Sequence, residues 1–330
     1  TDWQYYVLSL LVSVVIVWYL FTKIDFVELC NLLIHIHLQG FIAYLATYAG
    51  LIVFRALRFH ILVGSGKISF PEMILVTMVR NLFVDLLPAR LGALSYIYIL
   101  TRRFGFAFEI GAASLLLSFL FDFLVMVPLL LIAILAAGTE GNIFLNPVFL
   151  SFSGLFLLIF IIAVIYIVPI LRIVLKTSDW ILKCLHLNHL NMVQFLKEKF
   201  RLVIIQTQII KDRGIFSTIL VISILVRLFK YASLYYLLYS LLFNEGIMLY
   251  NLDFWKVFLC SAGAELSAML PIQGIAGIGT WAAAWSLVFK AMGFEERLAV
   301  LSGLGVHLVT QVVEYTIGIA AILLLLKKRQ

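Results

Sequence analysis

Charged residues are scarce in this chain. Of its 330 residues only 12% are charged, whereas 64% are hydrophobic. An ordinary soluble domain carries about 25% charged residues, so this composition excludes that class and predicts a membrane protein with several spanning segments. The long apolar runs do not alternate with polar residues, which excludes the strands of a membrane barrel. Lipid offers no partner for free backbone polar groups, so the spans are expected to be helices.

Cysteine is also scarce. The three residues Cys30, Cys184 and Cys260 include no CxxC spacing, which argues against a disulfide framework or a redox motif. No P-loop, metalloprotease motif or nucleophile elbow occurs, so we expect neither a metal nor another cofactor. The net charge of +7 does not point to nucleic acid, because basic residues collect in the cytoplasmic loops of membrane proteins.

Six apolar segments are near or above the roughly 20 residues that a helix needs to cross the hydrocarbon core. The predicted spans are residues 3–21, 41–62, 108–136, 147–168, 214–242 and 298–326. The fold class predicted from them is an all-α polytopic membrane protein, with one integral membrane domain over residues 1–330. Its first half covers residues 41–168 and its second half covers residues 214–326.

Two further segments are apolar but broken. Residues 70–103 break at Pro88 and carry Arg80 and Asp85, and residues 253–293 break over positions 271–279. Irregular backbone at membrane depth is tolerated where protein buries it, so each segment predicts a re-entrant helical hairpin. Paired breaks in corresponding places of two halves are the best sequence indication of a transporter's binding site.

The distribution of basic residues predicts the orientation. With residues 171–213 placed in the cytoplasm, 17 Lys and Arg lie on that side, including Arg55 and Arg58, and 4 lie outside. This excess predicts cytoplasmic termini, and we expect the inner membrane of a prokaryote. Residues 171–213 then form one or two amphipathic helices on the inner leaflet. The two hairpins enter from opposite sides, as in an inverted repeat that gives alternating access to a midplane site.

Charges at membrane depth are costly and therefore mark candidate site residues. Arg80, Asp85 and Arg90 surround the first break, and Arg227 and Lys230 share one helix face at i,i+3 spacing. Because the planar fork of arginine suits phosphate, these five residues are predicted to bind an anionic headgroup. The alternatives are that Asp85 only neutralises a neighbouring arginine, and that Arg227 and Lys230 snorkel to the interface.

Other polar and small residues complete the predicted site. Asp122, Glu265, His307 and Glu314 are expected to balance the buried arginines or to carry a coupled proton, and both roles stay open. Six residues are predicted to shape the hairpin breaks or to let helices pack closely: Pro88, Gly92, Pro271, Gly274, Gly277 and Gly279.

The first break carries a recognisable motif. Asn81 together with Leu87-Pro88-Ala89-Arg90-Leu91-Gly92-Ala93-Leu94 resembles the "N…lPaRlGel" motif of the lysylphosphatidylglycerol synthase transmembrane family, also called flippase-like proteins. Leu270-Pro271 through Gly277-Ile278-Gly279 is similar to the family's second motif, with Thr280-Trp281-Ala282 in place of its acid. The resemblance covers nearly the whole chain in order.

The resemblance implies a lipid flippase that moves an anionic phospholipid or a lipid-linked molecule. Aminoacyl-lipid members carry a soluble acyltransferase domain after the membrane part, and the chain ends at Gln330, so we expect no aminoacyl transfer. One alternative is a membrane enzyme that transfers a sugar or headgroup to a lipid or polyprenyl carrier, with Asp85 or Glu265 as acid or base. Another is a membrane scaffold. Membrane lipids are the expected partners, nucleic acid is not, and a homo-oligomer stays open.

Overall fold

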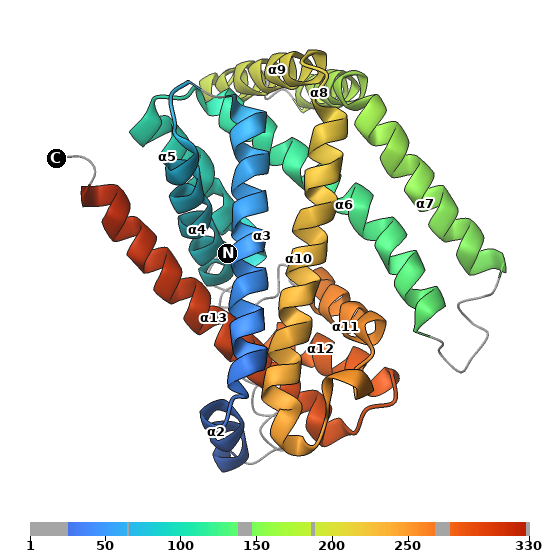
Figure 1. Cartoon of the computed structure of the whole chain (residues 1–330). Helices are drawn as coiled ribbons and strands as arrows, with labels where there is room; N and C mark the ends of the chain where they lie inside the picture. The colour runs from blue at the N-terminus through green and yellow to red at the C-terminus, as the bar shows by residue number, and fades with distance from the viewer. Residues whose placement is uncertain (1–25, 65, 138–146, 186–188, 268–277, 328–330) are drawn as a thin grey trace.

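The all-α prediction is confirmed. The computed structural model describes residues 26–64, 66–137, 147–185, 189–267 and 278–327, and within these ranges it contains helices and no strand. The long helices form a bundle, and two helices lie across one end of it (Figure 1). The predicted span 3–21 lies outside the described residues.

Four helical segments of the described ranges are long and apolar enough to cross a membrane. They are α3 (Leu38–Val63), α6 (Phe108–Ala136), α10 (Phe216–Leu242) with the short η2 (Phe243–Glu245), and α13 (Glu296–Lys327), and they match four of the six predicted spans. A fifth candidate is the end of α7 (Pro147–Ile165) taken together with α8 (Ile167–Cys184), which meet at a bend of 86°. The predicted span 147–168 therefore stops being straight at Ile165.

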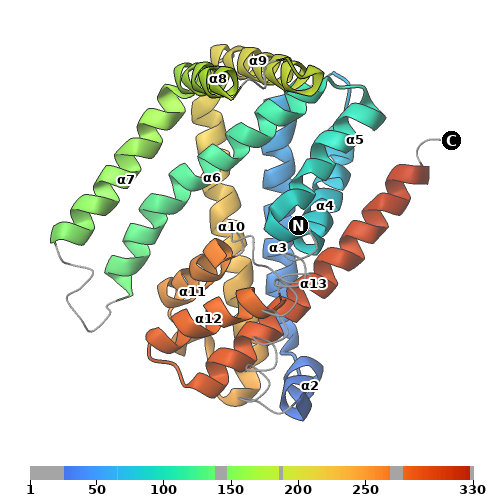
Figure 2. The same ribbon diagram turned by 180° about the vertical axis from the view of Figure 1, so that it is seen from behind.

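The centre of the bundle is the pair α3 and α10, which lie side by side in both views (Figures 1 and 2). Glycine lets these two helices approach closely, since a Cβ added at Gly50 would lie 2.4 Å from the ring of Phe229. Tyr44 of α3 and Leu237 of α10 have no exposed surface. Close packing of this kind is what holds helices together in lipid, where the hydrophobic drive between spans is absent.

The first broken segment is a helical hairpin. It consists of α4 (Phe70–Leu86), the turn η1 (Pro88–Ala93) and α5 (Leu94–Phe104), and the helices pack against each other. The Lys67 ammonium donates a hydrogen bond to the Gly105 carbonyl at 3.1 Å, so both ends of the hairpin meet on one side.

Local chemistry explains the turn of this hairpin. Pro88 cannot continue the hydrogen-bond ladder of α4, and the chain turns there. A Cβ at Gly92 would lie 1.7 Å from the carbonyl oxygen of Phe83, so the turn folds back onto α4 only because residue 92 is glycine.

The second broken segment also contains a helix pair, α11 (Phe254–Ser267) and α12 (Ile278–Ala291), which follows the short η3 (Leu249–Asn251). The two helices pack closely, since a Cβ at Gly263 would lie 2.8 Å from Val288. The break itself, with Pro271, Gly274 and Gly277, lies outside the described residues. Gly279 is the second residue of α12.

The two halves share one order of elements, a long helix, a hairpin and a second long helix. Equivalent helices run in opposite directions, α3 against α10 and α6 against α13 (Figure 1). A glycine with positive φ follows each returning helix, 65° at Gly105 directly after α5 and 90° at Gly293 two residues after the end of α12. This arrangement is the one that an inverted repeat requires.

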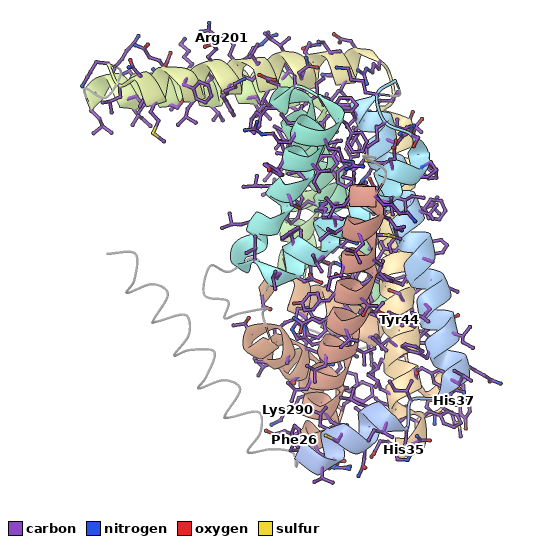
Figure 3. All side chains as sticks on the ribbon, turned by 90° about the vertical axis from the view of Figure 1, so that its left-hand side faces the viewer. Phe26, His35, His37, Tyr44, Arg201 and Lys290 are labelled. Carbon is purple, nitrogen blue, oxygen red and sulfur yellow. The ribbon has the colours of Figure 1, made fainter. Side chains whose placement is uncertain are left out.

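The two ends of the bundle differ. At one end α8 and α9 (Asn191–Asp212) lie across the other helices and extend beyond them (Figure 3). The Lys199–Glu109 ion pair, 2.7 Å between Nζ and Oε1, fixes α9 to the start of α6. The predicted amphipathic segment 171–213 is thus two helices, and α8 begins before it. At the other end lies α2 (Phe26–Ile34), which Glu28 ties to Arg297 of α13.

Candidate functional site

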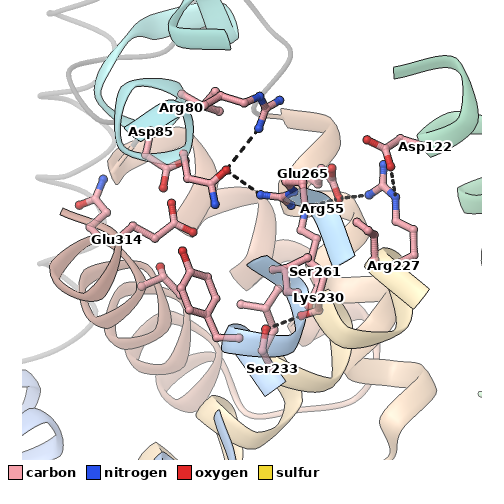
Figure 4. Close-up of a pocket in the computed structure, with 18 of the residues that line it drawn as sticks. Arg55, Arg80, Asp85, Asp122, Arg227, Lys230, Ser233, Ser261, Glu265 and Glu314 are labelled. Atoms are coloured by element: carbon pink, nitrogen blue, oxygen red, sulfur yellow. Dashed lines mark hydrogen bonds and ion pairs between the residues drawn. The ribbon is translucent and has the colours of Figure 1, made fainter. Parts of the chain in front are cut away.

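A polar cavity of about 190 Å³ lies inside the bundle (Figure 4). Its walls come from both helical hairpins and from the long helices α3, α6, α10 and α13. Five basic and four acidic described side chains line it, which leaves one net positive charge with its histidine neutral. These nine side chains are Arg55, Arg58, Arg80, Arg227, Lys230, Asp85, Asp122, Glu265 and Glu314.

The cavity brings together most of the site residues that the sequence predicts. Of the predicted headgroup ligands, Arg80, Asp85, Arg227 and Lys230 line it, and so do all four predicted balancing residues, Asp122, Glu265, His307 and Glu314. Arg90 belongs to η1, in the turn of the first hairpin, together with Pro88 and Gly92. Shared location in one cavity does not assign a role to each residue, so these roles stay predictions.

Part of the cavity wall is a series of alternating charges, which we call the ion-pair ladder: Arg58, Asp122, Arg227, Glu265 and Lys230. Arg58 donates two hydrogen bonds to Asp122, at 2.7 and 3.1 Å, and Nε of Arg227 lies 3.7 Å from Asp122 Oδ1. Oε2 of Glu265 then accepts from both Arg227 Nη1 at 2.8 Å and Lys230 Nζ at 2.7 Å. Buried charges persist only when paired in this way.

A second group of basic residues has a different partner. Arg55 Nη1 donates to the side-chain oxygen of Asn81 at 2.8 Å, and Arg80 Nη1 donates to the same oxygen at 3.3 Å. The Arg80 guanidinium also lies over the ring of Phe59, 5.5 Å from its centroid. Two cations therefore converge on one neutral amide.

The remaining wall is acidic and aromatic. Asp85 and Glu314 lie on one side of Arg55 in Figure 4, and Asp122 and Arg227 lie on the other. The His307 ring stacks on Trp281, with 5.1 Å between centroids and 27° between planes, so α12 and α13 present an aromatic surface to the cavity.

The sequence-based placement of Arg55 and Arg58 among cytoplasmic basic residues is wrong. Both lie within α3 and line the cavity, and Arg58 is only 1% exposed. The sequence did contain a signal for their location within the bundle. The two residues are inside the predicted span 41–62, at the same i,i+3 spacing as Arg227 and Lys230. The excess of basic residues on the predicted cytoplasmic side remains without them.

The comparisons with known proteins give one match. The family model described as the lysylphosphatidylglycerol synthase TM region matches residues 6–318, a range that includes both hairpins and the cavity. No curated protein and no solved structure matches the chain significantly.

Proposed function

The chain belongs to the lysylphosphatidylglycerol synthase transmembrane family, and from that premise we propose that it translocates an anionic phospholipid or a lipid-linked molecule across the membrane. Membership points to a role connected with membrane lipids. The finer proposal rests on one observation: a charged cavity is built between two helical hairpins inside an apolar bundle. Buried charge of this kind in a membrane protein marks a substrate or ion path.

The size of the cavity suits a headgroup rather than a whole lipid. At about 190 Å³ it is smaller than the roughly 300–1,000 Å³ of pockets that enclose drug-sized molecules. Apolar side chains continue outward from it at the turn of the first hairpin, where Leu86, Leu87, Leu91 and Leu94 are exposed. A headgroup in the cavity therefore leaves its acyl chains beside an apolar surface.

The arrangement of the halves supports alternating access. The first hairpin starts and ends near the α8–α9 end, and equivalent helices of the halves run in opposite directions. Asp85 on α4 and Glu265 on α11 bring the two hairpins to the same cavity. We propose that both hairpins are re-entrant, that the α8–α9 end is cytoplasmic, and that rocking of the halves opens the cavity to each side in turn.

Lipid movement in proteoliposomes tests this function. A fluorescent phosphatidylglycerol is placed in both leaflets, and a membrane-impermeant quencher then reports how much lipid reaches the outer leaflet. The wild-type protein is expected to raise the quenched fraction above that of empty liposomes, and folded Arg90→Ala is expected not to. If wild-type protein moves neither phosphatidylglycerol nor a polyprenyl phosphate, the translocator proposal fails.

The same samples separate transport from chemistry. Translocation leaves the covalent structure of the lipid unchanged, so mass spectrometry of lipid recovered after incubation with a labelled sugar or headgroup donor is expected to show no new species. A new lipid product would instead support the alternative of a membrane transferase, which needs a positioned acid or base.

A further inference from the structure

We infer that the phosphate of the transported molecule binds between Arg55 and Arg80, with the Asn81 amide as a third donor. This inference rests on the proposed function and specifies where in the cavity the headgroup is held. It also separates this group, the Arg55–Asn81–Arg80 cluster, from the ion-pair ladder that lines the same cavity.

The ladder is a poor phosphate site because its cations already have carboxylate partners. Arg58 is paired at two points with Asp122, and Arg227 and Lys230 share an oxygen of Glu265. A phosphate that bound there would have to displace a buried carboxylate, which would then lose its own partner.

In the Arg55–Asn81–Arg80 cluster, Arg55 has the opposite balance. In the described part of the chain Arg55 forms no ion pair with a carboxylate, and its guanidinium donates a hydrogen bond to the neutral oxygen of Asn81. Arg80 approaches the same oxygen and is only 8% exposed. The guanidinium groups of Arg55 and Arg80 approach the same oxygen, so their like charges repel each other in a medium of low dielectric constant. An anion bound between them offsets that repulsion.

Asn81 supplies an independent indication of a ligand. Its side chain is 3% exposed, and its amide nitrogen has no hydrogen-bond partner, although buried donors are nearly always paired. The amide oxygen serves the two arginines, which leaves the NH₂ group as a donor in the cavity wall. Two guanidinium forks and one amide donor match the several acceptor oxygens of a phosphate group.

The surroundings of the cluster favour a phosphate that belongs to a lipid. Val84 lies one turn after Arg80 on α4, Leu87 directly follows the end of α4, and both line the same cavity. These two residues lead to the hairpin turn and its exposed leucines. A phosphodiester held at the cluster therefore places its glycerol next to apolar side chains. A free phosphate ion has no group that would contact them.

Equilibrium binding to the full chain in detergent tests the inference. Isothermal titration is made with dihexanoyl phosphatidylglycerol, with dihexanoylglycerol that lacks phosphate, with glycerol 3-phosphate and with inorganic phosphate. The variants are Arg55→Gln and Arg80→Gln in the cluster and Lys230→Gln in the ladder. Arg172→Gln on α8 is the matched control, since it removes one exposed positive charge outside the cavity.

We expect dihexanoyl phosphatidylglycerol to bind and dihexanoylglycerol to bind at least about tenfold more weakly, because hydrogen bonds to charged groups contribute most of the affinity. Arg55→Gln and Arg80→Gln are each expected to weaken binding at least about tenfold, and Lys230→Gln is expected to weaken it less. The reverse order would place the phosphate on the ladder and overturn the inference. If inorganic phosphate bound as tightly as dihexanoyl phosphatidylglycerol, the inference that the bound phosphate belongs to a lipid would be overturned.

Stability separates a binding residue from a structural one. Because Arg55 gives up no ion pair, the ligand-free Arg55→Gln protein is expected to melt at or above the temperature of the wild type. A lower melting temperature would show that the Arg55 guanidinium supports the fold, and the inference would be wrong.

Transport measurements distinguish the failure of this inference from failure of the proposed function. If phosphatidylglycerol binding depends on Arg55 but no lipid moves in proteoliposomes, the phosphate site is supported and the translocator proposal fails. If lipid moves in proteoliposomes equally well with Arg55→Gln, the translocator proposal is supported and the phosphate site is refuted.

Discussion

Arg58 and Asp122 form a two-point ion pair between α3 and α6, with nitrogen–oxygen distances of 2.7 and 3.1 Å. One turn earlier on α3, Arg55 contacts the neutral amide of Asn81. Two arginines of one helix thus face one cavity with opposite electrostatic conditions. The first is neutralised within the protein, and the second is available to a ligand. The two residues should therefore respond to substitution in opposite ways.

The first prediction concerns stability. Arg58→Gln removes the bidentate partner of the partly buried Asp122, which keeps only Arg227 at 3.7 Å. We expect a cost below the roughly 3–5 kcal/mol that breaking a fully buried ion pair takes. We expect a clear fall in the melting temperature of the purified protein in detergent. The double variant Arg58→Gln/Asp122→Asn is expected to recover part of that loss, because neither partner then carries a charge. A single variant that melts with the wild type would contradict the structural role of this pair.

The second prediction concerns the turn of the first hairpin. Gly92→Ala adds a methyl group at a position where a Cβ would lie 1.7 Å from the Phe83 carbonyl oxygen, so α4 and the turn must separate. We expect a loss of stability at or above about 3 kcal/mol, the upper end of ordinary point substitutions, together with loss of lipid movement. Gly154→Ala on α7 is the control, because nothing lies within 4 Å of a Cβ there. Equal melting temperatures for the two variants would count against the hairpin geometry.

Much of the fold was open to prediction because lipid imposes simple rules. Apolar length alone located α3, α6, α10 and α13, and Pro88 with Gly92 located the first turn. The bend after Ile165 was not predicted, although Pro169 explains it. A proline ring clashes with the carbonyl four residues earlier, which ends α7 at that point.

Pairing between helices was harder to predict than helix position. The residues of the Arg58–Asp122 pair are 64 positions apart, and their contact depends on how α3 and α6 are rotated about their own axes. An amphipathic helix reveals that rotation through its apolar stripe, but α6 is apolar on nearly every side. Sequence reasoning therefore found Asp122 as an acid that balances a buried arginine, without finding Arg58 as its two-point partner.

The third prediction concerns the charge balance of the cavity. Glu265→Gln removes the carboxylate that Arg227 and Lys230 share, so the net positive charge of the cavity rises and a phosphate is attracted more strongly. We expect dihexanoyl phosphatidylglycerol to bind several-fold more tightly and lipid movement to slow, because the tighter complex releases its lipid slowly. Glu109→Gln is the matched control, since it removes the same charge from the Lys199 pair outside the cavity. Weaker lipid binding in Glu265→Gln would mean that Glu265 itself contacts the headgroup.

The fourth prediction uses two native cysteines to test how the bundle lies in the membrane. Cys184 is exposed on α8, and Cys30 is partly exposed on α2 at the opposite end, whereas Cys260 is buried. Cys30→Ser and Cys184→Ser therefore each leave one reactive thiol, and each thiol reports one end. With the α8–α9 end in the cytoplasm, a membrane-impermeant maleimide is expected to label Cys30 from outside the cell and Cys184 only in inside-out vesicles. Reversed labelling would invert the orientation and leave the cavity argument intact. Labelling of both thiols from the same side would remove the basis for opposed hairpins, because the two ends of the bundle would then not lie across a bilayer.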